Sequence, residues 1–260
     1  MENKIMEKEI IKKDNPYAIP IAIIIAGVMA LGVITYNNAP NIQATLIDGG
    51  NILPLEAEKE ILATLTANGS IDPLKLPEVT ELNLLWAFGL ANKNQILEDG
   101  PIMDASYDGP TNMASVGGWT ATTGSVMDHY NQHVMVTLTL EEQALVKKIA
   151  KGIYRPCCNN STYFPDCNHG MAMLGLLEYL ASQGATEEEM WDTDITANMS
   201  WFPNQYQMIN QYFEQKGVAI KSINPQELLG AEYSSSSGFA KIAAQISQTK
   251  QPEGGSGCDI

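Results

Sequence analysis

Most of the chain beyond residue 53 carries apolar residues at helical rather than strand-like spacing. Residues 54–66 predict a helix, with acidic residues in the first turn and a glycine, Gly69, just past the end. Residues 78–92 predict a second helix, and because this helix is apolar on most sides we expect it to be buried. A strand-like pattern is confined to short runs such as residues 134–138. The pattern therefore predicts a mainly α fold.

Two capping boxes mark the starts of further helices. In such a box a threonine hydroxyl and a glutamate carboxylate three residues later each accept a backbone N–H that the helix leaves unpaired. Thr139 and Glu142 predict a helix that runs to residue 151, and Thr186 and Glu189 predict one that runs towards residue 198.

Two more helices follow from single residues. Asn168 or Asp166 is a suitable cap for a helix that continues to Gln183 and ends at Gly184. Pro203 suits the first turn of a helix that ends before residue 217. Residues 125–133 predict a short helix and residues 99–124 a long loop.

The N-terminal region differs from the rest. Residues 17–36 contain no charged side chain, and twenty helical residues span the ~30 Å hydrocarbon core of a bilayer. Tyr17 and Tyr36 stand where interfacial aromatic residues occur. We expect an uncleaved single-pass signal-anchor rather than a cleaved signal peptide, whose apolar core usually has ~7–15 residues.

This anchor sets the expected domain organisation. Residues 1–16 form a cytoplasmic tail, residues 17–36 the transmembrane anchor and residues 37–53 a linker. Residues 54–233 form a helical, Cys/His-rich extracytoplasmic domain. Residues 234–260, with their serine run, glycines and Cys258, form a flexible tail.

Charge narrows the possible partners. The chain of 260 residues has a formal net charge of −15, whereas nucleic-acid binding needs a basic surface. We therefore expect no nucleic-acid partner. The membrane, through residues 17–36, is the predicted partner, and other membrane or extracytoplasmic proteins remain possible partners.

Potential soft-metal ligands are concentrated in one part of the chain. Three of the four cysteines and one of the three histidines fall within residues 154–173, and the other two histidines lie upstream at helical spacing. Thiolate and imidazole ligands suit zinc and copper(I), and the nearby thioethers of Met171 and Met173 favour copper(I). The predicted metal ligands are Cys157, Cys158, Cys167, His169, His129 and His133.

The same cysteines allow two other interpretations. Cys167 is expected near a helix N-terminus, where the helix dipole favours a reactive thiolate, so a thiol–disulfide oxidoreductase is one alternative. A disulfide from Cys157 or Cys158 to Cys167 that only staples the loop of a structural or assembly protein is the other. Glu178 and Tyr179, farther along the same helix, are expected to be surface and packing groups. The sequence does not decide whether the protein is an enzyme.

The arrangement Pro156-Cys157-Cys158 followed by residues 166–170, Asp-Cys-Asn-His-Gly, resembles a motif of bacterial extracytoplasmic proteins. Those proteins carry Pro-Cys-Tyr-Cys-Gly-Cys and are membrane-attached and Cys/His-rich. Here a vicinal pair replaces the alternating cysteines, and the resemblance is confined to this segment. A fainter similarity to the helical thiol domain of cytochrome c maturation factors lacks their Cys-x-x-Cys. The first resemblance implies a bacterial, membrane-attached location.

Overall fold

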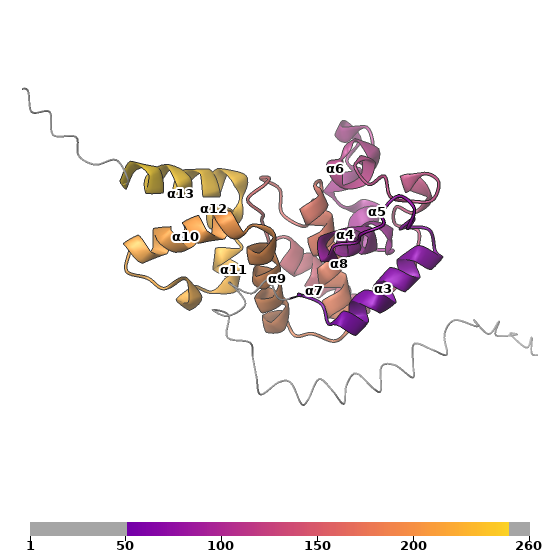
Figure 1. The fold of residues 1–260 in the computed structure, drawn as a ribbon, viewed down its shortest axis with the longest axis horizontal. Coiled ribbons are helices and arrows are strands. Elements are labelled where there is room, and N and C mark those ends of the chain that lie inside the picture. The colour runs from indigo at the N-terminus through magenta and orange to yellow at the C-terminus, as the bar shows by residue number, and fades with distance from the viewer. Residues whose placement is uncertain (1–50, 250–260) are drawn as a thin grey trace, which may run out of the picture. The chain divides into compact units, whose positions relative to one another are not determined.

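The computed structural model describes residues 51–249. In this range the chain is mainly helical, as predicted, and contains no β-strand (Figure 1). The strand-like pattern at residues 134–138 is not used for a strand, and the neighbouring backbone makes only an isolated bridge between Asn92 and His133.

The predicted cytoplasmic tail at residues 1–16, the anchor at residues 17–36, most of the linker and Cys258 lie outside the described residues. Within residues 51–249, no helix combines the length and the apolar character needed to cross a bilayer.

The longer helices are joined by short helical turns and loops. In chain order the α-helices are α3 (Leu55–Ala67), α4 (Glu81–Ala91), α5 (Gln95–Asp99), α6 (Ala114–Gly117), α7 (Leu140–Ala150), α8 (Asn168–Ser182), α9 (Glu187–Trp201), α10 (Pro203–Gln215), α11 (Pro225–Leu228), α12 (Ala231–Ser234) and α13 (Ser236–Thr249). The 3-10 helices are η1 (Pro101–Met103), η2 (Ala105–Tyr107), η3 (Pro110–Asn112), η4 (Val126–Asp128) and η5 (Ile220–Ser222).

Both predicted capping boxes are present. The Thr139 hydroxyl accepts the Glu142 N–H at 3.2 Å, and the Glu142 carboxylate accepts the Thr139 N–H at 2.7 Å. The corresponding pair at the start of α9, Thr186 and Glu189, has distances of 3.3 and 2.8 Å. Pro203 occupies the first turn of α10, where its missing N–H costs nothing. These helix starts are confirmed because they depend on contacts within four residues.

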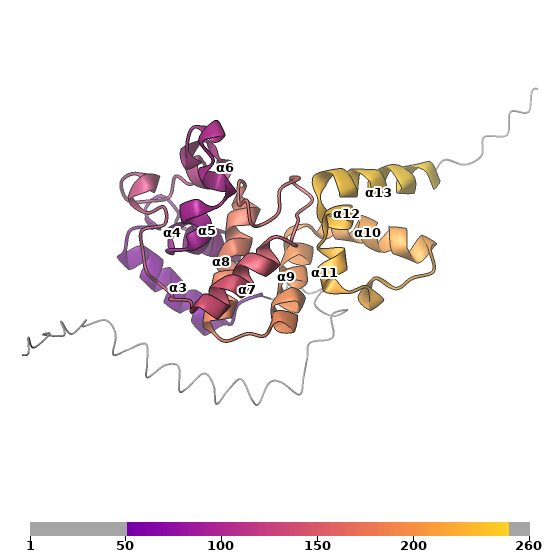
Figure 2. The same cartoon turned by 180° about the vertical axis from the view of Figure 1, so that it is seen from behind.

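Helices α4 and α8 cross closely at the centre of the core, and they lie side by side in both views (Figures 1 and 2). Glycines make this approach possible. A Cβ on Gly89 would lie 2.2 Å from the Met171 carbonyl oxygen, and one on Gly175 would lie 2.4 Å from the Leu85 carbonyl oxygen. The backbones therefore touch at a distance that no larger residue permits.

The predicted loop at residues 99–124 is ordered and contains η1, η2, η3 and the single turn α6. Two indoles fix it to the core. The Trp86 N–H donates to the Ser115 carbonyl at 2.6 Å, and the Trp119 N–H donates to the Ser70 carbonyl at 3.0 Å. The short helix predicted at residues 125–133 is only the 3-10 turn η4, and the chain then turns through Asn131 with a φ of 56°.

The prediction of a flexible tail from residue 234 is wrong over residues 236–249, which form α13. The serine run lies at the start of this helix and does not form a flexible segment. Ser235 acts as its cap, because its hydroxyl accepts the Gly238 N–H at 2.9 Å. Ile242 and Ile246 are buried one turn apart, and α13 packs on α10 and α12.

A series of hydrogen bonds between buried side chains joins the C-terminal helices to α9. The Asn198 amide donates to the Tyr206 hydroxyl at 3.1 Å, and that hydroxyl lies 2.6 Å from the Ser234 hydroxyl. The same Asn198 amide also donates to the Tyr154 carbonyl at 2.8 Å, just before the cysteine segment. The C-terminal helices thus connect, through Asn198 of α9, to the loop that carries Cys157 and Cys158.

Candidate metal centre

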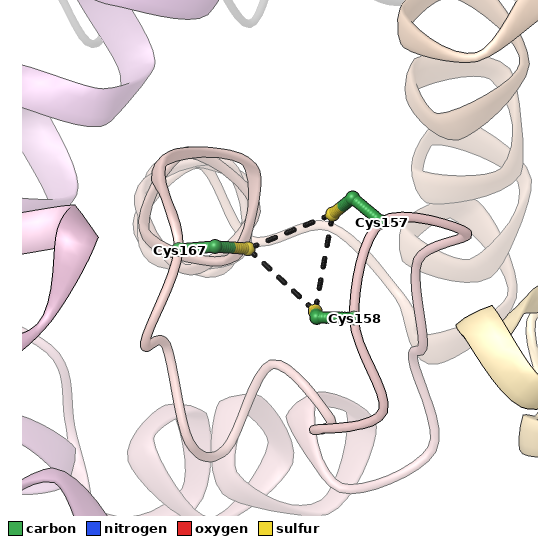
Figure 3. A group of neighbouring side chains, drawn as sticks. All are labelled: Cys157, Cys158 and Cys167. Atoms are coloured by element: carbon green, nitrogen blue, oxygen red, sulfur yellow. Dashed lines mark hydrogen bonds between the residues drawn. The ribbon is translucent and has the colours of Figure 1, made fainter.

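Three cysteine sulfurs form a triangle between the loop after α7 and the start of α8 (Figure 3). The Sγ–Sγ distances are 3.9 Å from Cys157 to Cys158, 3.8 Å from Cys157 to Cys167 and 3.7 Å from Cys158 to Cys167. All three are free cysteines, since a disulfide has an S–S bond of ~2.05 Å. Among the described residues, these cysteines are the set of potential metal ligands that converge on one point.

A tight turn presents the vicinal pair. The Cys158 N–H donates to the Arg155 carbonyl at 3.2 Å, which closes a four-residue turn. Pro156 stands at the second position of the turn, where a proline ring presets the backbone. Both sulfurs of the pair then point across the loop to Cys167 (Figure 3).

Cys167 is the N-cap residue of α8, in place of the predicted caps Asn168 and Asp166. Its sulfur accepts the Gly170 N–H at 3.4 Å. The expectation that Cys167 lies at a helix N-terminus is confirmed, and the helix places partial positive charge beside this sulfur.

The loop between the two cysteine positions folds back on α7. The Thr162 N–H donates to the Ile153 carbonyl and the Tyr163 N–H donates to the Ala150 carbonyl, each at 2.9 Å. The Asn160 amide donates to the Asp166 carboxylate at 2.8 Å. These bonds hold the ends of the loop together, so that residues ten positions apart can share one site.

Arg155 lies behind the triangle and is fully buried. Its guanidinium donates to the Thr162 hydroxyl at 2.9 Å, to the Asn160 carbonyl at 3.1 Å and to the Cys158 sulfur at 3.2 Å. The nearest carboxylate oxygen, on Asp166, is 3.8 Å away and accepts no hydrogen bond. A buried cation needs a close counter-charge. The cysteine sulfurs are placed to provide it together with the Asp166 carboxylate, which forms an ion pair with the guanidinium at this distance.

Gly170 makes room for this arginine. A Cβ at this position would lie 2.8 Å from a guanidinium nitrogen of Arg155. The glycine thus serves the site twice, because its N–H binds the Cys167 sulfur and its missing side chain admits Arg155.

The electrostatics favour a thiolate at Cys167. Hydrogen bonds from the Cys157 and Cys158 thiols lower the pKa of Cys167, and the Arg155 charge and the Gly170 N–H act in the same direction against burial. The pKa of Cys157 is raised, first by its hydrogen bonds to the other two sulfurs. The cluster therefore holds negative charge first on the sulfur at the helix end.

The predicted ligand His169 is not part of the group that converges with the three sulfurs. Its ring packs against Phe202, with ring centroids 4.5 Å apart, and against Trp201 at 6.1 Å. Burial lowers the pKa of His169, and its Nδ1 is buried without a hydrogen-bond partner. His169 thus lies two residues from Cys167 but faces the end of α9.

His129 and His133 lie side by side, with ring centroids 5.3 Å apart, but on a turn rather than on the predicted helix, and they contact each other. The distance from His129 Nδ1 to His133 Nε2 is 3.0 Å, and His129 Nε2 donates to the Thr123 carbonyl at 2.8 Å. That donation leaves His129 Nδ1 as an acceptor for the His133 N–H. His129 is buried and also contacts the Ser70 hydroxyl at 3.4 Å. The structure does not bring this pair into the cysteine group.

Sequence reasoning missed Arg155 and misplaced Glu178. Arg155 is the only arginine of the 260 residues and stands two positions before Cys157, which is a signal that the sequence does contain. Glu178 is fully buried rather than at the surface, and accepts the Asn92 amide at 2.8 Å. In the local sequence, only the apolar residues around Glu178 indicate that it is buried.

Three thiolates at this spacing can coordinate a metal ion, and with a close pair of sulfurs they can also carry out thiol–disulfide exchange. Comparison of the chain with known proteins gave no matching family model, no similar curated protein and no similar solved structure. The interpretation of the site therefore depends on its own geometry and charge.

Proposed function

We propose that this protein binds one soft or borderline metal ion, zinc or copper(I), through the thiolates of Cys157, Cys158 and Cys167. The observation that carries the proposal is the size of the sulfur triangle, 3.7–3.9 Å on each side. Zn–S bonds of ~2.3 Å at tetrahedral angles place two sulfur ligands ~3.8 Å apart, and trigonal coordination with the same bond length needs ~4.0 Å. The three sulfurs thus already have the spacing of ligands around one ion.

Charge supports the same proposal. Three thiolates carry three negative charges, and buried Arg155 next to Cys158 supplies one positive charge. The Asp166 carboxylate, which pairs with Arg155 at 3.8 Å, adds one negative charge. A divalent ion leaves one negative charge on the whole group, whereas a monovalent ion leaves two. Since uncompensated charge in a partly buried site is costly, the balance favours zinc.

The predicted preference for copper(I) has less support. It depended on the thioethers of Met171 and Met173, and both side chains are fully buried in the hydrophobic core. The donor set that converges is made of thiolates alone, which suit either metal.

We further propose that the site faces the extracytoplasmic side of a membrane. The support is the uncharged run at residues 17–36, which is long enough to span a bilayer. A protein of this kind would hold its metal at a membrane surface.

Metal analysis of the full chain, purified under reducing, anaerobic conditions without chelator, tests the metal proposal. We expect about one equivalent of zinc or copper per chain, and substantial loss of that metal in Cys167→Ser. Two controls should keep their metal. These are Cys258→Ser, which removes the remaining cysteine, and His133→Ala, which removes a histidine outside the sulfur group. A metal content far below one equivalent that Cys167→Ser leaves unchanged would contradict the proposal.

A second candidate function is thiol–disulfide exchange. The lowered pKa of Cys167 favours it, as does the exposed residue Cys157, whose sulfur is 3.8 Å from that of Cys167. The Cys167 thiolate would attack a substrate disulfide, and Cys157 would then displace the second substrate thiol. The products are a Cys157–Cys167 disulfide and a reduced substrate. Mass spectrometry after alkylation, with and without reductant, tests this function. Cysteines that neither become oxidised nor reduce a test disulfide exclude it.

A further inference from the structure

The three sulfurs have unequal environments. The Cys158 sulfur accepts an Arg155 N–H at 3.2 Å, and the Cys167 sulfur accepts the Gly170 N–H at 3.4 Å. Both residues are partly buried, whereas Cys157 is exposed. Within the described residues, the hydrogen bonds of the Cys157 sulfur are those to the other two sulfurs.

This inequality matters for a bound ion. N–H groups that donate to a thiolate hold it in position and stabilise its charge, and such partners typically change metal affinity ~10–100-fold. Two of the three ligands are held in this way, and one is not. The unsupported ligand is also the most exposed of the three.

The coordination is also incomplete. The three cysteines supply three ligands, and no histidine, aspartate or glutamate among the described residues joins them. A four-coordinate ion would therefore present one position to an outside ligand, as open metal sites do.

That position does not open into a cavity that the described residues form elsewhere in the fold. The cavity is lined by residues of α9 and by the start of α11 with its N-cap residue, and none of the three cysteines contributes to it. A surface position with one exposed ligand suits exchange of the ion itself more than catalysis on an enclosed substrate.

We infer that Cys157 is the exchange ligand through which this site passes its metal to, or receives it from, a partner that carries a thiol. This inference rests on the proposed metal-binding function. The incoming thiol binds the ion at the open position as a thiolate, the bond from the ion to the Cys157 sulfur breaks, and Cys157 takes up the released proton. Cys158 and Cys167 keep the ion until further incoming thiols replace them one at a time, and each cysteine that leaves the ion takes up the proton of the thiol that replaces it. No electron is transferred in any step.

The experiment uses the full chain with Cys258→Ser, so that only the three site cysteines react, loaded with one equivalent of Zn(II). Alkylation with a small excess of iodoacetamide is followed by mass spectrometry, with zinc content measured in parallel. We expect Cys157 to react at least about tenfold faster than Cys158 and Cys167 while zinc is bound. Added glutathione should raise the labelling of Cys157 further before zinc is lost.

Two forms of thiol separate the possible partners. Glutathione represents a small thiol, and a short peptide with two cysteines represents a protein at the same thiol concentration. If the peptide removes zinc faster than glutathione does, the partner is a protein. If the two rates of zinc removal are equal, a small thiol is sufficient to take the metal.

Other results would overturn the inference. If all three cysteines gain reactivity together with zinc loss, or if Cys158 or Cys167 reacts first, the exchange role of Cys157 is wrong while metal binding stands. If the chain with all site cysteines reduced binds neither zinc nor copper(I), the proposed function itself fails.

Discussion

At the scale of single residues, Glu178 is a buried carboxyl group outside the metal centre. Its side chain is fully buried in α8 and accepts one hydrogen bond from the Asn92 amide, while its other oxygen has no hydrogen-bond partner. Burial raises the pKa of Glu178 well above the usual range, against the opposing effect of the Asn92 and Asn94 amides. The folded protein therefore holds a proton here that the unfolded chain releases.

This proton predicts a pH dependence of stability. The unfolded carboxyl ionises near its ordinary pKa of about 4.3, and the folded one only at higher pH. Between these two values the folded state binds more protons, so its free energy of unfolding falls as pH rises, by at most ~1.4 kcal/mol per pH unit for one group. Glu178→Gln should remove this component, which urea unfolding at pH 5, 6, 7 and 8 would measure.

Glu141→Gln, at an exposed position of α7, is the matched control and should follow the wild-type pH profile. Parallel profiles for wild type and Glu178→Gln would show that Glu178 is not the group responsible.

Glu178 and Arg155 show why residue roles were harder to predict than helices. Each role depends on partners distant in the chain or around a loop. The amide that binds Glu178 is 86 positions away, and Arg155 is useful only once the loop closes and Gly170 leaves space for it. The sequence located the three cysteines because they are close in the chain. The sequence could not show that the three histidines contact other residues and not the cysteine sulfurs.

At the scale of elements, helix starts were predictable because caps are local, as Thr139, Thr186 and Pro203 show. The same local chemistry was overlooked at α13, where a serine run was interpreted as a mobile tail although Ser235 caps a helix. The pairing of helices was not predictable from local patterns. The crossing of α4 and α8 depends on two glycines 86 positions apart, and neither helix alone indicates its partner.

The crossing gives a second prediction. In an isolated helix, Gly→Ala stabilises by about 1 kcal/mol. Gly89→Ala should instead destabilise this protein by about 3 kcal/mol, because the new methyl group meets the Met171 carbonyl oxygen and no side-chain rotation can relieve the clash. Chemical denaturation followed by circular dichroism measures the difference.

Gly184→Ala is the control for the glycine substitution itself. Gly184 follows α8 with a φ of +75° and open space around its Cβ position. An alanine there suffers only the backbone cost of a left-handed conformation, about 1 kcal/mol. If Gly89→Ala costs no more than Gly184→Ala, the helices are not in backbone contact at this point.

At the scale of the whole described region, the metal centre depends on contacts with the C-terminal helices as well as on α8. The Tyr154 N–H donates to the Leu229 carbonyl at 2.8 Å, and the Cys158 carbonyl accepts the Ser236 N–H at 2.9 Å. The Asn159 side chain accepts the Ser237 N–H at 2.9 Å. The vicinal cysteines are thus held against the N-terminus of α13 while Cys167 is held by α8, so the packing of the C-terminal helices determines the size of the sulfur triangle.

Ser236→Pro tests this connection with a minimal change. Ser236 is the first residue of α13, where proline is well tolerated, and Ser235 before it has the extended backbone that a following proline requires. The helix should therefore remain while the one N–H that binds the Cys158 carbonyl disappears. We expect zinc affinity, measured by competition with a chromophoric chelator, to fall about tenfold, as for other groups that support a ligand indirectly. Ser237→Ala keeps both backbone donors and should bind zinc like the wild type. Unchanged affinity in Ser236→Pro, with α13 intact by circular dichroism, would mean that α8 and Arg155 alone hold the sulfurs in place.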